Sequence, residues 1–299
     1  MINTGTILKF IVLRLIYYFY NVRVFDWRAY VGIALLGFVR SVEASPFNIL
    51  IYRALRFMVT IIFYLAFTFS INNCFDIKCD IYKGANIKRN PVAAGHITFR
   101  EGLVLSLCMA FTGLVLSYLW LNENCFLIYL MMLLLGGSYS VPPLRLKSTP
   151  LMDLLSHSLF FGALLYLYGL LSNGGISLQE ASLATSVSLY SIILELRNHL
   201  EDYQADLNSK TRTTACYMGY SRSIRLLRSL IVVHYIFLTA ISYPSGNLSS
   251  SLILASAILA ASKLFNLRFN HLVRLTDLYT FVMYLLISSP MISQLLNLG

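Results

Sequence analysis

The chain has 299 residues, of which 58% are hydrophobic and only 12% are charged. Soluble globular domains carry about 25% charged residues, so this composition excludes an ordinary water-soluble fold. The formal net charge of +10 sits in polar segments between apolar runs, which argues against nucleic acid as a partner and favours membrane lipid headgroups or an anionic substrate.

The apolar runs are continuous and long enough for helices that cross a bilayer. At about 20 residues per span, they predict an all-α integral membrane protein with about nine transmembrane helices. We expect these helices near residues 29–47, 54–73, 103–121, 125–138, 151–171, 178–197, 229–244, 250–265 and 277–297. Residues 1–28 are predicted to form an interfacial N-terminal helix, and 29–299 a single transmembrane domain.

The polar segments between these runs differ in charge. All but three of the 23 Lys and Arg residues lie near the N-terminus or in and beside the segments 74–102, 139–150, 198–228 and 266–276. Because basic loops are retained in the cytoplasm, we predict a multi-pass protein with these loops on the cytoplasmic side. The exceptions, Arg40, Arg53 and Arg56, are expected to snorkel toward the opposite surface.

The second expected span leads into a segment with three oxygen-bearing side chains at helical spacing. Asn72, Asp76 and Asp80 stand at positions i, i+4 and i+8, so on a continuing helix they share one face over two turns. A role as helix caps is disfavoured, because the helix dipole opposes acidic groups at a C-terminus. Mg²⁺ prefers oxygen ligands of this kind and shares one or two carboxylates with substrate phosphates.

The same pattern recurs after the sixth expected span, where Asn198, Asp202 and Asp206 stand at i, i+4 and i+8. The chain therefore divides into two pseudo-repeats, about 29–150 and 151–299, whose clusters we expect to face each other across a central cavity. We predict that all six residues bind Mg²⁺, as about two ions, and that the four aspartates are catalytic.

Basic residues follow each cluster. A diphosphate carries roughly three negative charges, which Lys, Arg and Mg²⁺ can neutralise as it departs as a leaving group. In a third segment, Pro142 and Pro143 fix an extended turn that directs the neighbouring basic residues over the cavity. The predicted substrate-binding residues are Lys83, Lys88, Arg89, Tyr139, Arg145, Lys147, Lys210 and Arg212.

Taken together, these motifs resemble the UbiA superfamily of intramembrane prenyltransferases. The family signature Asn-Asp-x-x-Asp-x-x-x-Asp is similar to residues 72–80, and its Arg-Pro-x-x-x-Gly segment is similar to 89–95 with one residue inserted. The second signature resembles 202–206 and the Lys and Thr residues after it. The loop 139–147 is similar to that of members acting on quinone, chlorophyll or archaeal lipid precursors. One departure is Asn73, where the family usually has Asp.

The resemblance implies nine transmembrane helices around a cavity, with the diphosphate at the cytoplasmic end and the prenyl tail running toward lipid. We expect a Mg²⁺-dependent prenyltransferase that ionises an isoprenyl diphosphate and transfers the prenyl group to an aromatic or other lipophilic acceptor. Arg145 and Lys147 are candidates for an acceptor carboxylate, which favours transfer.

Two alternatives remain. One is a UbiA-type terpene cyclase, in which the substrate's own double bond captures the carbocation, and Asn73 slightly favours it. The other is a transporter without chemistry. It is disfavoured, because transporter sites lie near the bilayer midplane and these clusters lie at span ends.

Overall fold

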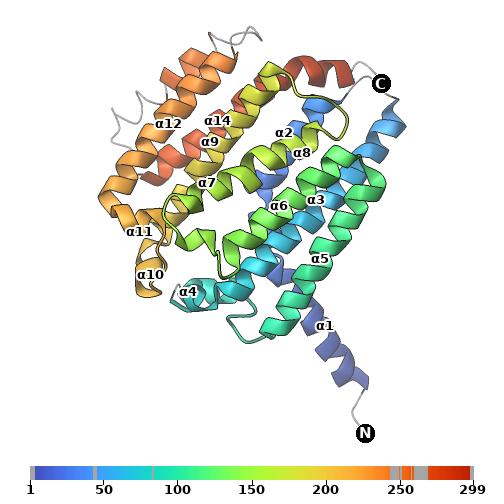
Figure 1. Ribbon diagram of the computed structural model, residues 1–299, viewed down its shortest axis with the longest axis vertical. Coiled ribbons are helices and arrows are strands. Elements are labelled where there is room, and N and C mark those ends of the chain that lie inside the picture. The colour runs from blue at the N-terminus through green and yellow to red at the C-terminus, as the bar shows by residue number, and fades with distance from the viewer. Residues whose placement is uncertain are drawn as a thin grey trace.

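The computed structural model describes residues 4–42, 46–82, 84–242, 249, 251–256, 258 and 269–296. All regular elements within these ranges are helical and none is a strand, which confirms the predicted all-α class. Figure 1 shows the long helices side by side along one direction. The short helices α4 (Ile77–Tyr82), α10 (Tyr203–Asn208) and α11 (Thr214–Met218) lie together at one end.

The first half of the chain builds one side of the bundle. Its long helices are α2 (Arg28–Ser41), α3 (Phe47–Phe75), α5 (Phe99–Trp120) and α6 (Glu123–Ser140). α3 packs along α5, and α6 contacts both. Polar caps fix two of the starting points: Thr98 and Glu101 form a capping box ahead of α5, and the Asn122 side chain accepts a hydrogen bond from Cys125 N in α6.

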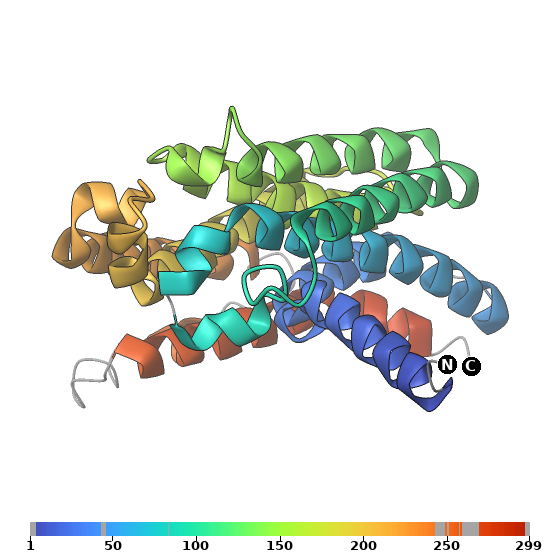
Figure 2. The ribbon, with the colours of Figure 1, turned by 90° about the horizontal axis from the view of Figure 1, so that it is seen from below.

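The second half begins with a helix that changes pitch. α7 (Met152–Ser158) passes through a π-helical turn, η4 (Leu159–Ala163), into α8 (Leu164–Leu170). α9 (Leu178–Glu201), α12 (Tyr220–Ser242) and α14 (Phe269–Leu296) follow. α9 packs against α7 and α12, while α14 packs against α12 and α2, so the two halves close on each other. Figure 2 shows α14 and the N-terminal α1 (Thr4–Asn21) on the side of the bundle away from α6.

Within the described residues, five helices are long and apolar enough to cross a membrane, and each overlaps a predicted span. Three further predicted spans correspond to α2, α6 and α9, so the count of nine is approximate. α9 is more polar than a typical span, because it carries Glu180, Glu195, Arg197 and Glu201. The predicted span 250–265 lies mostly outside the described residues.

α2 and α8 cross at two glycines. A Cβ atom on Gly37 would lie 2.0 Å from the carbonyl oxygen of Tyr166, and one on Gly169 would lie 2.3 Å from that of Ala34. Contact distances this short leave no room for any side chain. Small residues at helix crossings are typical of membrane proteins, where close backbone packing replaces the hydrophobic effect.

A buried ion pair fastens the end of the bundle opposite the short helices. Arg40 Nε donates to Glu180 Oε1 at 3.0 Å, and Arg40 Nη1 donates to the carbonyl of Ile287 at 3.1 Å. The Tyr166 hydroxyl also donates to Glu180. Arg40 was expected to snorkel toward the membrane surface, but its side chain is only 3% exposed. That expectation is wrong, because a carboxylate from α9 provides a partner inside the bundle.

The N-terminal helix is tied to the first half of the bundle. Asn73 Nδ2 donates to the carbonyl of Asn21 at 2.9 Å, and Arg14 pairs with Glu101 at the start of α5. Asn73 is fully buried in this contact. The interfacial position of residues 1–28 stays a prediction.

Candidate active site

Both Asn/Asp clusters lie where a long helix ends. α3 stops just before Asp76, and α9 stops just before Asp202. Asp76 has φ −98° and ψ 8°, and Asp202 has φ −93° and ψ 2°, so both occupy the sparsely populated bridge region of backbone conformations. The expected continuous helices are therefore corrected in the same way in both halves, by a bend at the middle aspartate.

The backbone hydrogen bonds nevertheless continue through each bend. Asp76 N donates to Asn72 O and Asp80 N to Asp76 O, both at 2.9 Å. In the second half, Asp202 N donates to the carbonyl of residue 198 at 2.9 Å, and Asp206 N to that of residue 202 at 3.0 Å. The i, i+4, i+8 register therefore survives, and the shared geometry supports the predicted pseudo-repeat.

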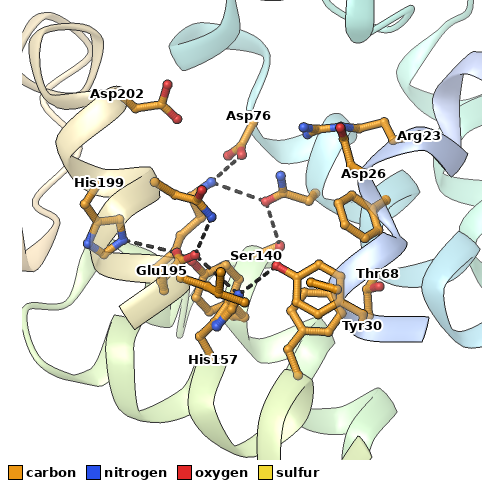
Figure 3. A pocket seen from close by; sticks show the side chains of 18 of the residues that line it. Arg23, Asp26, Tyr30, Thr68, Asp76, Ser140, His157, Glu195, His199 and Asp202 are labelled. Carbon is orange, nitrogen blue, oxygen red and sulfur yellow. Dashed lines mark hydrogen bonds and ion pairs between the residues drawn. The ribbon is translucent and has the colours of Figure 1, made fainter. Parts of the chain in front are cut away.

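One cavity of about 870 Å³ lies between the two clusters. Figure 3 shows Asp76 and Asp202 on opposite sides of it. All six predicted metal ligands line its wall: Asn72, Asp76, Asp80, Asn198, Asp202 and Asp206. The expectation that the two halves face each other across a cavity is confirmed.

The loop after α6 supplies one cation to the cavity. Lys147 lines the wall, pairs with Asp76, and donates to Asn72 Oδ1 at 3.3 Å. Tyr139, in the last turn of α6, also lines the cavity. Arg145 does not line it: its guanidinium donates to the carbonyl of Phe75 at 3.3 Å and lies 3.6 Å from Asp76 Oδ1. Arg145 therefore lies beside the first cluster and is not among the residues that line the cavity, and its role in substrate binding stays a prediction.

The other predicted substrate-binding residues divide into three groups. Arg89 lines the main cavity with an exposed side chain. Lys210 and Arg212 line a separate hollow of about 450 Å³, on a different side of Asp206, so they do not face the main cavity. Lys83 and the side chain of Lys88 lie outside the described residues, and their roles stay predictions.

Side chains outside the clusters hold the last aspartate of each. Asn90 Nδ2 donates to Asp80 Oδ2 at 2.7 Å and to the carbonyl of Asn73 at 2.9 Å. The Cys79 thiol lies 3.1 Å from Asp206 Oδ1 and so connects the two short helices that follow the bends. Each contact fixes the orientation of a carboxylate through a hydrogen bond from a neighbouring side chain, as is common around metal sites.

The inner end of the cavity contains polar residues that the sequence patterns did not single out. Glu195, three residues before Asn198, is buried and contacts His157 and His199 at 3.3 and 3.1 Å. A charged residue inside a predicted span was the available signal, because such residues are costly in a membrane and are usually functional. Arg23 and Asp26, which pair at 2.8 Å, also line the wall, so the connection between α1 and α2 belongs to the cavity.

The oxygen-bearing side chains of the two clusters suit Mg²⁺ that is also bound by substrate. Within the described residues, no three His, Cys, Asp or Glu side chains stand close enough to hold a metal ion by themselves. Asp76 Oδ1 is buried and accepts no hydrogen bond, and the predicted ligands Asn72 and Asn198 line the same wall. Such a site suits an ion that takes one or two carboxylates and completes its shell with substrate phosphates and water.

An all-helical bundle that surrounds one acid-lined cavity, with apolar helices long enough for a bilayer, defines an integral membrane protein with an internal polar site. The UbiA prenyltransferase family matches residues 30–287, and the chain belongs to that family.

Several curated relatives are similar in sequence. The chain is 29% identical over 229 residues to a 2-acylphloroglucinol 4-prenyltransferase of Humulus lupulus. The aligned region covers 73% of this chain and 55% of the relative. It is 26% identical over 212 residues to a digeranylgeranylglyceryl phosphate synthase of Sulfurisphaera tokodaii, with 68% and 71% covered. The chain thus spans about half the length of the Humulus lupulus relatives it matches.

Solved structures share the fold. A UbiA homolog from Archaeoglobus fulgidus bound to GPP and Mg²⁺ superposes with a TM-score of 0.71 at 20% identity, covering 93% of this chain and 99% of that one. A structure of digeranylgeranylglyceryl phosphate synthase gives a TM-score of 0.63 at 19% identity, covering 94% and 99%. At this level of identity the similarity establishes the arrangement of the helices.

Proposed function

We propose that this chain is a Mg²⁺-dependent prenyltransferase of the membrane, which transfers an isoprenyl group from its diphosphate to an aromatic or other lipophilic acceptor. The observation that carries the proposal is the meeting of two equivalent Asn/Asp clusters across one cavity. The relatives support it, because one is named as a prenyltransferase of acylphloroglucinol and another protein of the same fold is bound to GPP and Mg²⁺.

In this proposal, Mg²⁺ is held by the six cluster residues, which are Asn72, Asp76, Asp80, Asn198, Asp202 and Asp206. Bound Mg²⁺ supplies charge neutralisation for the diphosphate oxygens. Lys147 stands beside Asp76, where its ammonium group can bind the same oxygens, and Arg89 lies at the exposed rim. We place this end of the cavity at the cytoplasmic surface, on the distribution of basic loops.

The reaction breaks the bond between the allylic carbon and the diphosphate oxygen, and both electrons leave on the oxygen. A new bond then forms between that carbon and the acceptor, and the proton that the acceptor loses passes to the released diphosphate. The inner wall suits a carbocation, because aromatic rings gather there: Tyr30 stacks on Phe161 with 3.9 Å between centroids, and Phe160 is tilted against Phe161 at 4.6 Å. Such rings exclude water and present π faces to a cation.

Transfer to an external acceptor is favoured over cyclisation. One relative named above is a 2-acylphloroglucinol 4-prenyltransferase, and this name specifies an external acceptor. Asn73, which slightly favoured a cyclase on sequence, is fully buried, and its Nδ2 donates to the carbonyl of Asn21 in the N-terminal helix.

The test of this proposal is diphosphate release by purified protein given Mg²⁺, a prenyl diphosphate and a phenolic acceptor. Asp76→Ala and Asp202→Ala should each lower kcat at least about 100-fold, because each removes electrostatic stabilisation of the leaving group. Glu123→Gln, at the start of α6 and exposed at the opposite end of the bundle, is the control and should keep full activity. Undiminished turnover in both Asp variants, or cyclic products formed without acceptor, would refute the proposal.

A further inference from the structure

The inner end of the cavity holds a carboxylate that the proposed reaction does not use. Glu195 lines the cavity wall and is 6% exposed. The Tyr139 hydroxyl donates to it, Asn198 Nδ2 donates to its Oε2 at 3.1 Å, and His199 Nε2 lies 3.1 Å from its Oε1. In these contacts Glu195 acts as an acceptor at both oxygens, as an ionised carboxylate does.

The groups around Glu195 are hydroxyls and imidazoles from several helices. His157 Nε2 lies 3.3 Å from Glu195 Oε2 and 3.3 Å from the Tyr30 hydroxyl, and its Nδ1 lies 2.9 Å from Ser191 Oγ. Figure 3 shows Tyr30, His157 and Glu195 together on the side of the cavity away from Asp76 and Asp202. This end of the cavity therefore offers both donors and acceptors of hydrogen bonds.

Of the five Lys and Arg residues that line the described part of the cavity, three are paired with carboxylates. Lys147 pairs with Asp76, Arg197 Nη1 pairs with Asp277 at 3.0 Å, and Arg23 pairs with Asp26. Arg28 and Arg89 have exposed side chains. Both imidazoles beside Glu195 lie near carboxylates: His157 contacts Glu195, and His199 lies between Glu195 and Asp153, with its Nδ1 3.7 Å from Asp153 and without a hydrogen bond.

We propose that Glu195 makes the inner end of the cavity selective for acceptors that present hydroxyl groups there and no carboxylate. This inference rests on the proposed prenyl transfer and names the class of its acceptor. A phenolic hydroxyl can exchange hydrogen bonds with Tyr30, His157 and Tyr139. A carboxylate at the same place loses its hydration and meets the like charge of Glu195.

The discrimination should be measurable. Two carboxylates about 5 Å apart, at an effective dielectric constant near 20, repel each other by an amount that corresponds to a binding ratio on the order of 100. The neighbouring imidazoles reduce this ratio, so we expect a preference of at least about tenfold. Arg145 and Lys147, the expected binders of an acceptor carboxylate, stay at the outer end with Asp76.

The experiment compares matched acceptors that differ only in charge, namely 4-hydroxybenzoate with 4-hydroxybenzamide and homogentisate with its amide. For the wild-type protein in detergent with Mg²⁺ and geranyl diphosphate, kcat/KM should be at least about tenfold higher for each amide, chiefly through KM. Glu195→Gln keeps the shape of the side chain and removes its charge. It should lower the amide-to-acid ratio toward one.

Glu123→Gln is the control. It removes an exposed carboxylate at the opposite end of the bundle, outside the cavity lining, so it should leave the ratio unchanged. Equal kcat/KM for acid and amide in the wild type, or the same ratio in Glu195→Gln as in wild type, would overturn the inference. If Glu195→Gln does not fold, the amide-to-acid ratio of kcat/KM in the wild type still tests whether the cavity rejects a carboxylate. Absence of turnover with every diphosphate and acceptor would instead contradict the proposed function.

Discussion

Asn90 lies outside both clusters, yet it fixes Asp80 in place. Its amide nitrogen donates to Asp80 Oδ2, while its Oδ1 accepts from the backbone nitrogens of Val92 and Ala93. The turn that begins at Asn90 thus holds the side chain rigidly, and the side chain in turn holds the carboxylate. Because the Asp80 carboxylate is already oriented by this hydrogen bond, it loses less conformational freedom when a cation binds.

Asn90→Ala should therefore weaken Mg²⁺ binding without removing a ligand. Loss of a supporting hydrogen bond typically lowers metal affinity by about 10- to 100-fold. We expect the Mg²⁺ concentration for half-maximal diphosphate release to rise at least about tenfold. Asn122→Ala is the control: Asn122 also caps a turn and donates to a carbonyl, at the opposite end of the bundle, so it should lower stability and leave the Mg²⁺ requirement unchanged.

Lys147 and Arg145 are close in sequence, but only Lys147 is among the residues that line the cavity. Lys147→Ala should lower kcat/KM for the prenyl diphosphate at least about tenfold, because it removes a cation from the wall that binds the leaving group. Arg145→Ala should have a smaller effect, since Arg145 does not line the cavity. Steady-state kinetics over a range of diphosphate concentrations measures both variants, and equal losses would contradict the assignment of Lys147 as the substrate-facing cation.

Sequence patterns predicted the cluster residues well because their spacing is local. Asn72, Asp76 and Asp80 share a face through backbone hydrogen bonds within one segment. Which loop cation enters the cavity was not predictable in this way, because Arg145 adopts a left-handed conformation with φ 37° that turns it toward Phe75. Glu195 was missed because its partners come from three different helices, and only the tertiary fold brings them together.

At the scale of helices, the sequence predicted where the spans lie better than how they deviate from ideal geometry. The bends at Asp76 and Asp202 interrupt α3 and α9 at equivalent places, although nothing in the local composition marks a break. The π-helical turn at Leu159–Ala163 likewise falls in an apolar stretch. It places Phe160 and Phe161 against the cavity, which fits the frequent occurrence of such turns at functional sites.

The crossing of α2 and α8 permits a direct test of packing. Gly37→Ala and Gly169→Ala should each destabilise the protein by about 1–3 kcal/mol or more, because the added methyl group would overlap backbone atoms of the facing helix. Gly32→Ala, on α2 with no atom within 4 Å of the new methyl, should be neutral or slightly stabilising. Thermal unfolding in detergent measures the difference, and equal midpoints for all three variants would show that the two helices do not cross so closely.

At the scale of the whole molecule, each half of the chain contributes one cluster to a shared cavity. The halves meet through α2 and α14 and through the ion pair of Arg40 with Glu180 at the far end. At the cluster end, the contact of Cys79 with Asp206 links the two short helices α4 and α10. A diphosphate with Mg²⁺ would add a strong link there, because it binds both clusters at once.

Ligand binding should therefore stabilise the protein only when both clusters are intact. A ligand at about 100 times its Kd adds about 2.7 kcal/mol, which corresponds to a rise in Tm on the order of 5–10 °C. Geranyl diphosphate with Mg²⁺ should raise the Tm of the wild type, and EDTA should abolish the rise. Asp76→Asn and Asp202→Asn should each remove most of it, whereas Glu123→Gln should retain it. If either Asp variant kept the full shift, one cluster alone would hold the ligand, and the two halves would not share a site.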